Sequence, residues 1–480
     1  MLLNALAPYV PGPDNLWDKN KVKHLYRRVS YGADPATINS ALLLSPADAV
    51  NGLMDEALAQ QMSINPDWRE WSEADFTDYE AENQVLTNEL YRQVIDDVLY
   101  KGLRGRITLF WINHFVTELS VYHHSPYQFQ YYEILFNFGF GNFKDLVRFI
   151  GVSNAMLVYL NGFDNRKSEP NENFARELLE LFTLGVNNGY TEEDIVELSR
   201  ALTGFTQRES IGAPIQFNPD DFDSDFKTIF GRRGLWSYNE AIDLIFEERG
   251  ELMATFICEK LYRYFVSPAV DEAVVQEMAT LFIASEFEME PVLRTLFLSD
   301  HFFSEKVRGT LIKSPYDICC GLVAESGLEF GEENRTELLD TIQFMTAKMG
   351  QDFFNPIDVA GWQANRDWIN SNSIADRWYL LENLLQKMWN YNTQQFAEFA
   401  RELSGDSRDT AVVTSVVVDH FMPYPINLPV IYEEAESVLR WELPSNYYDE
   451  GNWSLGIDSA PFQVWLLIKY LYTLPEFQLR

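Results

Sequence analysis

The chain has few of the side chains from which metal and redox sites are usually built. Its 480 residues include six histidines and three cysteines, Cys258, Cys319 and Cys320. The cysteine spacing matches neither a disulfide framework nor a zinc motif. No histidine has the His-x-x-x-His or Glu-x-x-His spacing of helical metal sites. The sequence therefore disfavours a disulfide-stapled fold and a helical zinc or di-iron centre.

Positive charge is also scarce. Against 72 acidic residues there are 37 lysines and arginines, which gives a formal net charge of −35. Such a charge repels phosphate groups, so it disfavours binding to nucleic acid or to anionic membranes. It favours a cationic partner or a divalent metal, although adaptation to a saline habitat would produce the same composition.

Several sequence signals of location and chemistry are missing. No run reaches the roughly 18 apolar residues that a membrane helix requires. Residues 1–10 are apolar but lack the basic start of a signal peptide. We therefore expect a soluble, cytoplasmic protein without membrane insertion, with export alongside a partner as the alternative. Neither a Gly-x-Ser-x-Gly elbow nor a glycine-rich phosphate loop is present, which disfavours a serine hydrolase and the use of ATP or NAD.

What the chain has in quantity is apolar and aromatic residues with helical spacing. Hydrophobic residues make up 46% of the chain, with 34 Phe, 24 Tyr and 12 Trp, enough for a large core. The pattern predicts an all-α fold, a large multi-helix body with one small β-hairpin near 214–231. We expect an extended arm over 1–20, a main helical domain over 21–404, and an irregular segment with a closing helix, 405–480, packed on that domain.

The segment from Pro170 to Phe205 has the clearest start and stop signals. A first helix is expected to begin near Asn171 and to end at Gly185. A second is expected to open with Thr191 and Asp194, which have capping-box spacing. The polar side of the first helix carries Glu172, Asn173, Arg176, Glu177 and Glu180. Pairs spaced i,i+4 on this side would also suit an ordinary solvated helix face.

Eleven motifs, in order along the chain, carry a resemblance to a known family. They are His24-Leu-Tyr-Arg-Arg-Val-Ser-Tyr-Gly, Phe110-Trp-Ile-Asn-His-Phe, Ala155-Met156 with Tyr159-Leu-Asn, Pro170-Asn-Glu-Asn-Phe-Ala-Arg-Glu-Leu-Leu-Glu-Leu-Phe, Tyr190-Thr-Glu-Glu-Asp, Arg200-Ala-Leu-Thr-Gly, Lys227-Thr-Ile-Phe-Gly, Lys313-Ser-Pro, Gly350-Gln, Val359-Ala-Gly-Trp and Pro475-Glu-Phe-Gln. Together they resemble the bacterial family filed as domain of unknown function 1800, from about residue 20 to the end.

The resemblance implies a mainly helical protein without an established activity. Genes of the family often lie beside those of a sulfatase-like family, which implies a protein partner. Members usually have His-Asp before the Lys-Thr-Phe-Gly run, whereas this chain has Phe222-Asp223. A family chemistry that used that histidine is therefore in doubt here.

Five cations in these motifs stand out in so acidic a chain: Arg27, Arg28, Arg176, Arg200 and Lys227. We expect them to gather beside the helix start formed by Asn171 and Asn173, where they could clamp an anionic ligand together with Asn113. The alternative is that they are buried partners of acidic residues and fix how the helices pack.

Two further patterns suggest chemistry. His114 could act as a base beside Glu172, Glu177 or Glu180 as a general acid, although it could equally be a core histidine bound to a carbonyl. Asp221, Asp223 and Asp225 alternate like the start of a calcium loop. Phe226 and Arg232 exclude an EF-hand, and a looser calcium or magnesium site remains open.

These patterns leave two functions of different classes. The first is a soluble helical scaffold that binds a protein or small-molecule partner in a polar groove beside 171–184. The second is a hydrolase-like enzyme, assisted by a divalent metal, that uses His114 and the central carboxylates with Asp223 and Lys227. A concave pocket at His114 would favour the enzyme, and a self-paired charge network on the central helix would favour the scaffold.

Overall fold

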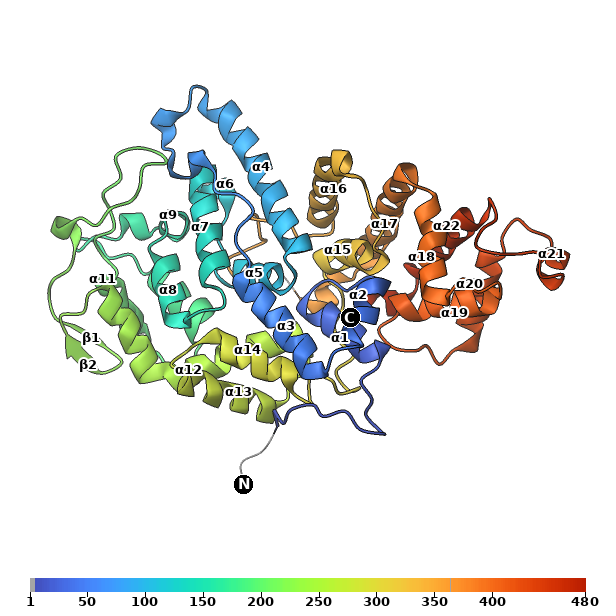
Figure 1. Ribbon diagram of the computed structural model, residues 1–480. Coiled ribbons are helices and arrows are strands. Elements are labelled where there is room, and N and C mark those ends of the chain that lie inside the picture. The colour runs from blue at the N-terminus through green and yellow to red at the C-terminus, as the bar shows by residue number, and fades with distance from the viewer. Residues whose placement is uncertain (1–4, 363) are drawn as a thin grey trace.

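The computed structural model describes residues 5–362 and 364–480, and in these ranges the fold is all-α with one two-stranded antiparallel sheet (Figure 1). The N-terminal half contains α1 (Lys19–Val29), α2 (Pro35–Ala41), α3 (Pro46–Ala59), α4 (Tyr79–Tyr100), α5 (Gly102–His114), α6 (Leu119–Tyr122), α7 (Ser125–Phe138), α8 (Phe143–Gly151), α9 (Asn154–Tyr159), α10 (Asn173–Glu177), α11 (Glu192–Ala201), β1 (Lys227–Ile229) and β2 (Arg232–Gly234).

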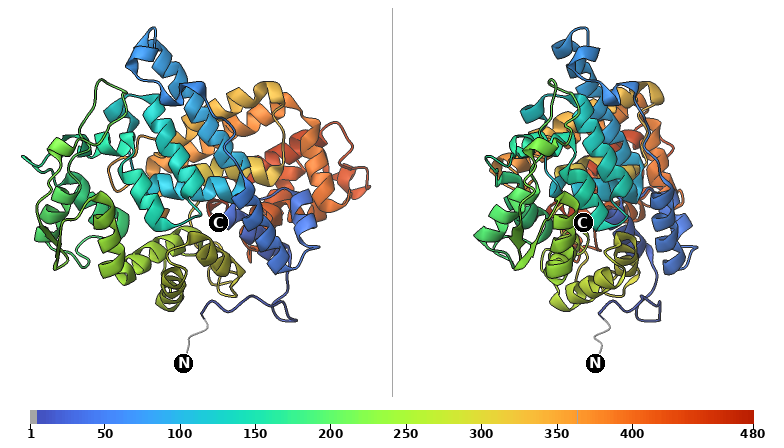
Figure 2. Two further views of the ribbon diagram at one scale, coloured as in Figure 1. Left: turned by 60° about the vertical axis from the view of Figure 1, so that its left-hand side comes forward. Right: turned by 90° about the vertical axis from the view of Figure 1, so that its left-hand side faces the viewer.

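The remainder of the chain is helical. It contains α12 (Tyr238–Phe265), α13 (Glu272–Ala284), α14 (Met289–Leu298), α15 (Pro315–Ser326), α16 (Arg335–Lys348), α17 (Ser371–Tyr391), α18 (Gln394–Ser404), α19 (Thr410–Phe421), α20 (Pro429–Leu439), α21 (Ser445–Asp449) and α22 (Ala460–Leu471). One continuous core includes residues from Leu6 to Phe477. The molecule is longer than it is deep, and its C-terminus lies in the middle of the body (Figures 1 and 2). None of the described helices is long and apolar enough to span a bilayer.

The central helix is wider than the sequence predicts. It begins as α10, where the Asn171 side chain accepts from the Asn173 amide at 2.9 Å, and it continues as a π-helix over Leu178–Thr183. In this π-turn the amide of Leu184 donates to the carbonyl of Leu179, five residues earlier, at 2.9 Å. The segment ends before Gly185, which has a φ of +96°. Such π-turns are rare inside helices and occur frequently at functional sites.

Two local expectations need correction. The hairpin is β1–β2, with its turn at Phe230–Gly231, so it begins and ends later than the predicted span of 214–231. The segment 405–480 is largely helical rather than irregular, and the β-branched run from Thr410 forms α19. Burial decides this case, because Val413, Val417 and Val418 all face the core with helical spacing.

The arginines of the basic helix α1 are buried in the core and do not lie at the surface. Arg28 is fully buried, and its Nη1 donates to the carbonyl of Val266 at the end of α12, at 2.8 Å. Arg27 donates to the carbonyls of His420 and Met422, at the end of α19, at 2.8 and 2.7 Å. The last carbonyls of a helix have no partner within the helix and carry partial negative charge, so buried guanidinium groups satisfy them well.

A buried carboxylate holds this arrangement together. Glu325, at the end of α15, is 2% exposed; it pairs with Arg27 and lies 3.8 Å from the Lys313 ammonium. Burial alone would raise the pKa of Glu325, but Arg27 and Lys313 outweigh it and hold the pKa below its usual value. Burial lowers the pKa of Lys313 to about 8.

Candidate functional site

A cavity of about 480 Å³ lies where five separate segments meet. They are the end of α5, the end of α12, the segment before α15, the loop 351–368, and Arg480. Its apolar lining includes Leu109, Phe110, Tyr264, Leu311, Trp362 and Trp368. Its polar lining consists of Asn113, His114, Lys260, Arg263, Ser314, Asp317, Gln351, Asn365 and Arg480. A mostly apolar hollow with a few converging polar groups is the usual form of a small-molecule site.

The π-turn orients the histidine of this cavity. Phe182 is in the last turn of the central helix, so its carbonyl oxygen accepts no hydrogen bond from within the helix. It faces His114 instead. His114 is 2% exposed, and its Nε2 lies 3.0 Å from the Phe182 carbonyl oxygen. Since a carbonyl oxygen only accepts, Nε2 carries the hydrogen and Nδ1 presents a lone pair.

That lone pair is occupied by a lysine. The Lys260 ammonium, on α12, lies 2.8 Å from His114 Nδ1 and has no carboxylate within ion-pair distance among the described residues. Burial lowers the pKa of Lys260 to about 8. Burial and the nearby Lys260 charge together hold the pKa of His114 well below 6.5, so this imidazole is neutral. The pair therefore consists of a neutral acceptor and an amine that loses its proton unusually easily.

A second polar cluster at the cavity consists of two guanidinium groups that share one carboxylate. Asp317 accepts from Arg106 through Oδ1, and its Oδ2 lies 3.1 Å from Nε of Arg480. Asp317 also closes the capping box with Ser314 that starts α15, which fixes its position. Two buried guanidinium groups against one side-chain carboxylate give these three side chains a formal charge of +1, and Nη1 of Arg480 is buried without a hydrogen-bond partner among the described residues.

The loop 351–368 forms the remaining wall. The side chain of Asn113 accepts from the Trp362 amide at 2.6 Å, which ties this loop to α5. Gly361 has a φ of +89°, and a β-carbon there would lie 2.7 Å from the Asn113 carbonyl oxygen, so this contact requires glycine. The indole N–H of Trp362 has no partner in the described part of the chain.

The cations singled out from the sequence do not gather at one place. Arg27 and Arg28 are used in the core of the molecule, as described above, whereas α11 and β1 lie at one end (Figure 1). There Arg200 pairs with Glu197 and Asp223, at 2.8 and 2.7 Å. The geometry therefore gives the expected clamp no support, because Arg27, Arg28 and Arg200 each have partners within the fold.

The predicted metal-binding segment is held by hydrogen bonds within and beside the hairpin. The residues concerned are Asp221, Asp223, Asp225 and Lys227. The Lys227 ammonium donates to the carbonyls of Asp223 and Asp225. Asp221 accepts from Thr206 and from Asn218, at 2.5 and 3.0 Å, while Asp223 accepts from Arg200. Within the described residues no three His, Cys, Asp or Glu side chains are grouped as metal ligands, so the geometry gives the calcium or magnesium hypothesis no support.

The polar side of the central helix is largely paired with itself. Arg176 lies 3.2 Å from Glu172, 3.4 Å from Glu180 and 2.8 Å from Glu192. None of these residues lines the cavity at His114, so the acid–base pairing of His114 with a central glutamate is not assembled.

Three other polar residues of the central segment do not take part in the Arg176 network. Asn171 caps the helix start, and Asn173 donates to the carbonyl of Leu160 at 3.2 Å. Glu177 is half-buried, and burial together with the Glu180 charge raises its pKa.

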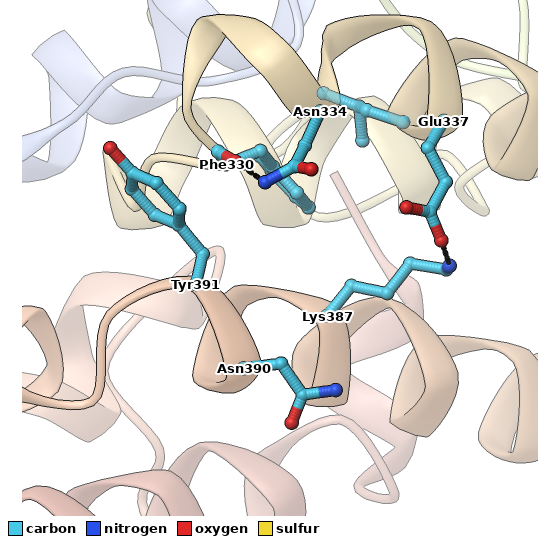
Figure 3. Close-up of a pocket in the computed structure, with 7 residues that line it drawn as sticks. Phe330, Asn334, Glu337, Lys387, Asn390 and Tyr391 are labelled. Atoms are coloured by element: carbon cyan, nitrogen blue, oxygen red, sulfur yellow. Dashed lines mark hydrogen bonds and ion pairs between the residues drawn. The ribbon is translucent and has the colours of Figure 1, made fainter.

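A second hollow lies between α16 and α17 (Figure 3). Lys387 of α17 reaches across it to pair with Glu337 of α16, and Asn334 donates to the Phe330 carbonyl at 2.7 Å. Glu337 is exposed, Lys387 is half-buried, and the two are paired. No polar group among the lining residues of this hollow is both buried and unpartnered. We therefore place the candidate site at the cavity beside His114.

Sequence reasoning identified His114 and Asn113 but missed Lys260, Asp317, Arg106 and Arg480. A signal was available in the motifs of the family resemblance. The segments Phe110–Phe115, Lys313–Pro315, Gly350–Gln351 and Val359–Trp362 all contribute to this cavity or its supports, although up to about half of the chain separates them.

Labelling can test the acidity of Lys260. We expect its reaction with trace acetic anhydride to rise with pH around a midpoint near 8, because burial lowers the pKa of Lys260 to about 8. Lysine in model peptides titrates near ~10.4. Peptide mass spectrometry after competitive labelling gives the midpoint, and the same digest of unfolded protein supplies the control. A midpoint near that of model peptides in the folded protein would contradict the burial of this amine.

Comparison with known proteins gives one match. The family model described as protein of unknown function, DUF1800, matches residues 24–479. No curated protein and no solved structure matches the chain.

Proposed function

Because the chain belongs to the DUF1800 family, whose function is unknown, we propose its role from the cavity: the protein binds a small organic anion with an apolar body. The observation that carries this proposal is the charge balance of the cavity. Its charged lining residues are Lys260, Arg263, Arg480 and Asp317. Arg263 is neutralised by Glu259, so two cations remain against one anion, in a chain of net charge −35.

The guanidinium of Arg480 is suited to anchor such a ligand. It is buried against the Tyr264 ring, 5.6 Å from the ring centroid, so its aliphatic stem and its plane are fixed by packing. A ligand carboxylate beside the Arg480 side chain would offset the excess positive charge of the Arg106, Arg480 and Asp317 side chains. A hydrogen bond to a charged group at a water-poor site contributes more than one at the surface.

The apolar lining suits the body of the ligand. Phe110, Trp362 and Trp368 contribute aromatic rings to the lining. A volume of about 480 Å³ accommodates a molecule of one or two rings and is too small for a folded partner. This proposal narrows the scaffold hypothesis to small-molecule binding and moves it from the groove beside 171–184 to the cavity at His114.

Calorimetry with 4-(hydroxymethyl)benzoate as the probe tests this proposal. We expect Arg480→Gln to weaken binding by about 10- to 100-fold, since a hydrogen bond to a charged group contributes about 1.5–3 kcal/mol. Asp317 retains Arg106 as its partner in this variant.

The matched control is Arg232→Gln, which removes an exposed guanidinium from the hairpin. Its affinity should equal that of the wild type. Equal affinity for all three proteins, or no binding by the wild type at millimolar probe, would overturn the proposal.

A further inference from the structure

Lys260 is a cavity-lining amine whose surroundings prevent the usual pairing of a lysine. Its neighbours on α12 are Arg263 and Glu259, and these two bind each other at 2.7 Å. Asp317, the carboxylate of the cavity lining, is occupied by Arg106 and Arg480. His114, from α5, is the one titratable group in hydrogen-bond contact with the amine among the described residues. No carboxylate therefore stabilises the ammonium form.

The hydrogen bond to His114 also orients the nitrogen. Since the Phe182 carbonyl fixes the hydrogen of His114 on Nε2, Nδ1 accepts one N–H of Lys260. When the ammonium loses a proton to solvent, that N–H remains engaged and the lone pair is left for a group in the cavity. A desolvated lysine held in this way is the usual starting point for reaction with a carbonyl.

We infer that Lys260 forms an imine with the carbonyl carbon of an aldehyde or ketone that also bears a carboxylate. This inference rests on the proposed function, because the carboxylate at Arg480 places the carbonyl in the cavity. The neutral amine adds its lone pair to the carbonyl carbon, and the C=O π electrons move to oxygen. A proton passes from nitrogen to that oxygen through solvent. The resulting carbinolamine loses water, and the product is an imine without any change in oxidation state.

The experiment uses three probes that differ in one group each. 4-Carboxybenzaldehyde has both groups, benzaldehyde lacks the carboxylate, and 4-(hydroxymethyl)benzoate lacks the carbonyl. The full-length protein is incubated with each aldehyde and cyanoborohydride, which reduces an imine to a stable secondary amine. Peptide mass spectrometry then locates the added mass. We expect modification of Lys260 by 4-carboxybenzaldehyde at least tenfold faster than modification of the surface lysine Lys387 in the same digest.

Variants and the other probes separate the two proposals. Lys260→Arg retains the charge but cannot form an imine, so it should lose this modification. If 4-(hydroxymethyl)benzoate binds but Lys260 reacts no faster than Lys387, the imine is overturned and anion binding stands. If Lys260 reacts equally fast with benzaldehyde, the carboxylate requirement is overturned. If the protein neither binds nor reacts, both proposals fail.

His114 is a positioning residue in this scheme, and its role has its own readout. His114→Asn keeps an oxygen acceptor near the place of Nδ1, whereas His114→Leu removes the acceptor. We expect the asparagine variant to keep selective modification of Lys260 and the leucine variant to lose most of it, with both variants checked for folding by circular dichroism. Equal rates in the two folded variants would overturn this role for His114.

Discussion

Glu325→Ala is expected to lower the free energy of unfolding by about 3–5 kcal/mol, because it leaves the guanidinium of Arg27 buried without its carboxylate. Lys313, with a pKa of about 8, can lose its proton and so avoid being a buried charge without a partner, but an arginine cannot. Chemical denaturation at pH 7 measures the difference. The control is Glu337→Ala, which breaks the exposed pair with Lys387 and should cost no more than about 1 kcal/mol.

The stability difference between Glu325→Ala and the wild type should also depend on pH. Because the pKa of Glu325 is lowered in the folded state, its stabilising contribution is present above the unfolded value of about 4.3 and is lost as pH falls through the lower folded value. The difference in stability between wild type and Glu325→Ala should therefore narrow below about pH 4. A difference that stays constant down to the acid transition would contradict an ionised Glu325 in the folded protein.

Gly361→Ala is the second change with a large expected effect, of about 2–3 kcal/mol in unfolding free energy and at least tenfold in affinity for 4-(hydroxymethyl)benzoate. A non-glycine residue at a φ of +89° is strained by about 1–3 kcal/mol. The new methyl group would also collide with Asn113 and break its hydrogen bond to the Trp362 amide, worth about 0.5–1.5 kcal/mol. The wall formed by the loop 351–368 would then move away from α5.

Gly350→Ala is a close control for this prediction. Gly350 has a φ of +90°, but a β-carbon there would have no atom within 4 Å. The two glycines thus share the same unfavourable φ, and only Gly361→Ala adds the overlap with Asn113. Similar affinity losses in both variants would show that the contact with Asn113 does not shape the cavity.

Much of the fold could be predicted from the sequence because it depends on local rules. The capping box of Thr191 and Asp194 starts α11 as expected, and the helical spacing of apolar residues predicts an all-α body. The three cysteines are buried thiols. The helical state of α19 could not be decided locally, because β-branched residues favour strands when considered alone and only burial against neighbouring helices reverses that preference.

The sequence indicated some residues of the candidate site and missed others, because it does not show which partner each charged side chain has in the fold. The scarcity of cations did indicate that each one has a specific role. It could not indicate whether Arg28 would meet a ligand or the carbonyl of Val266, since both offer negative charge to a guanidinium. Likewise the spacing of Lys260 along α12 contains no information about His114, which is 146 residues away.

The π-turn over Leu178–Thr183 has a consequence for genetics. The group that sets the tautomer of His114 is the main-chain oxygen of Phe182, and every amino acid placed at that position supplies the same oxygen. Point substitutions would report the packing of the buried Phe182 ring, which lies against His114 and Phe115, and not this oxygen. A deletion of one residue in this segment would convert the wide turn to an ordinary one and rotate the oxygen away by about 100°, the angle between successive residues of an α-helix. Loss of the His114 contact after a deletion, but not after a substitution at position 182, would be the mark of this backbone contact.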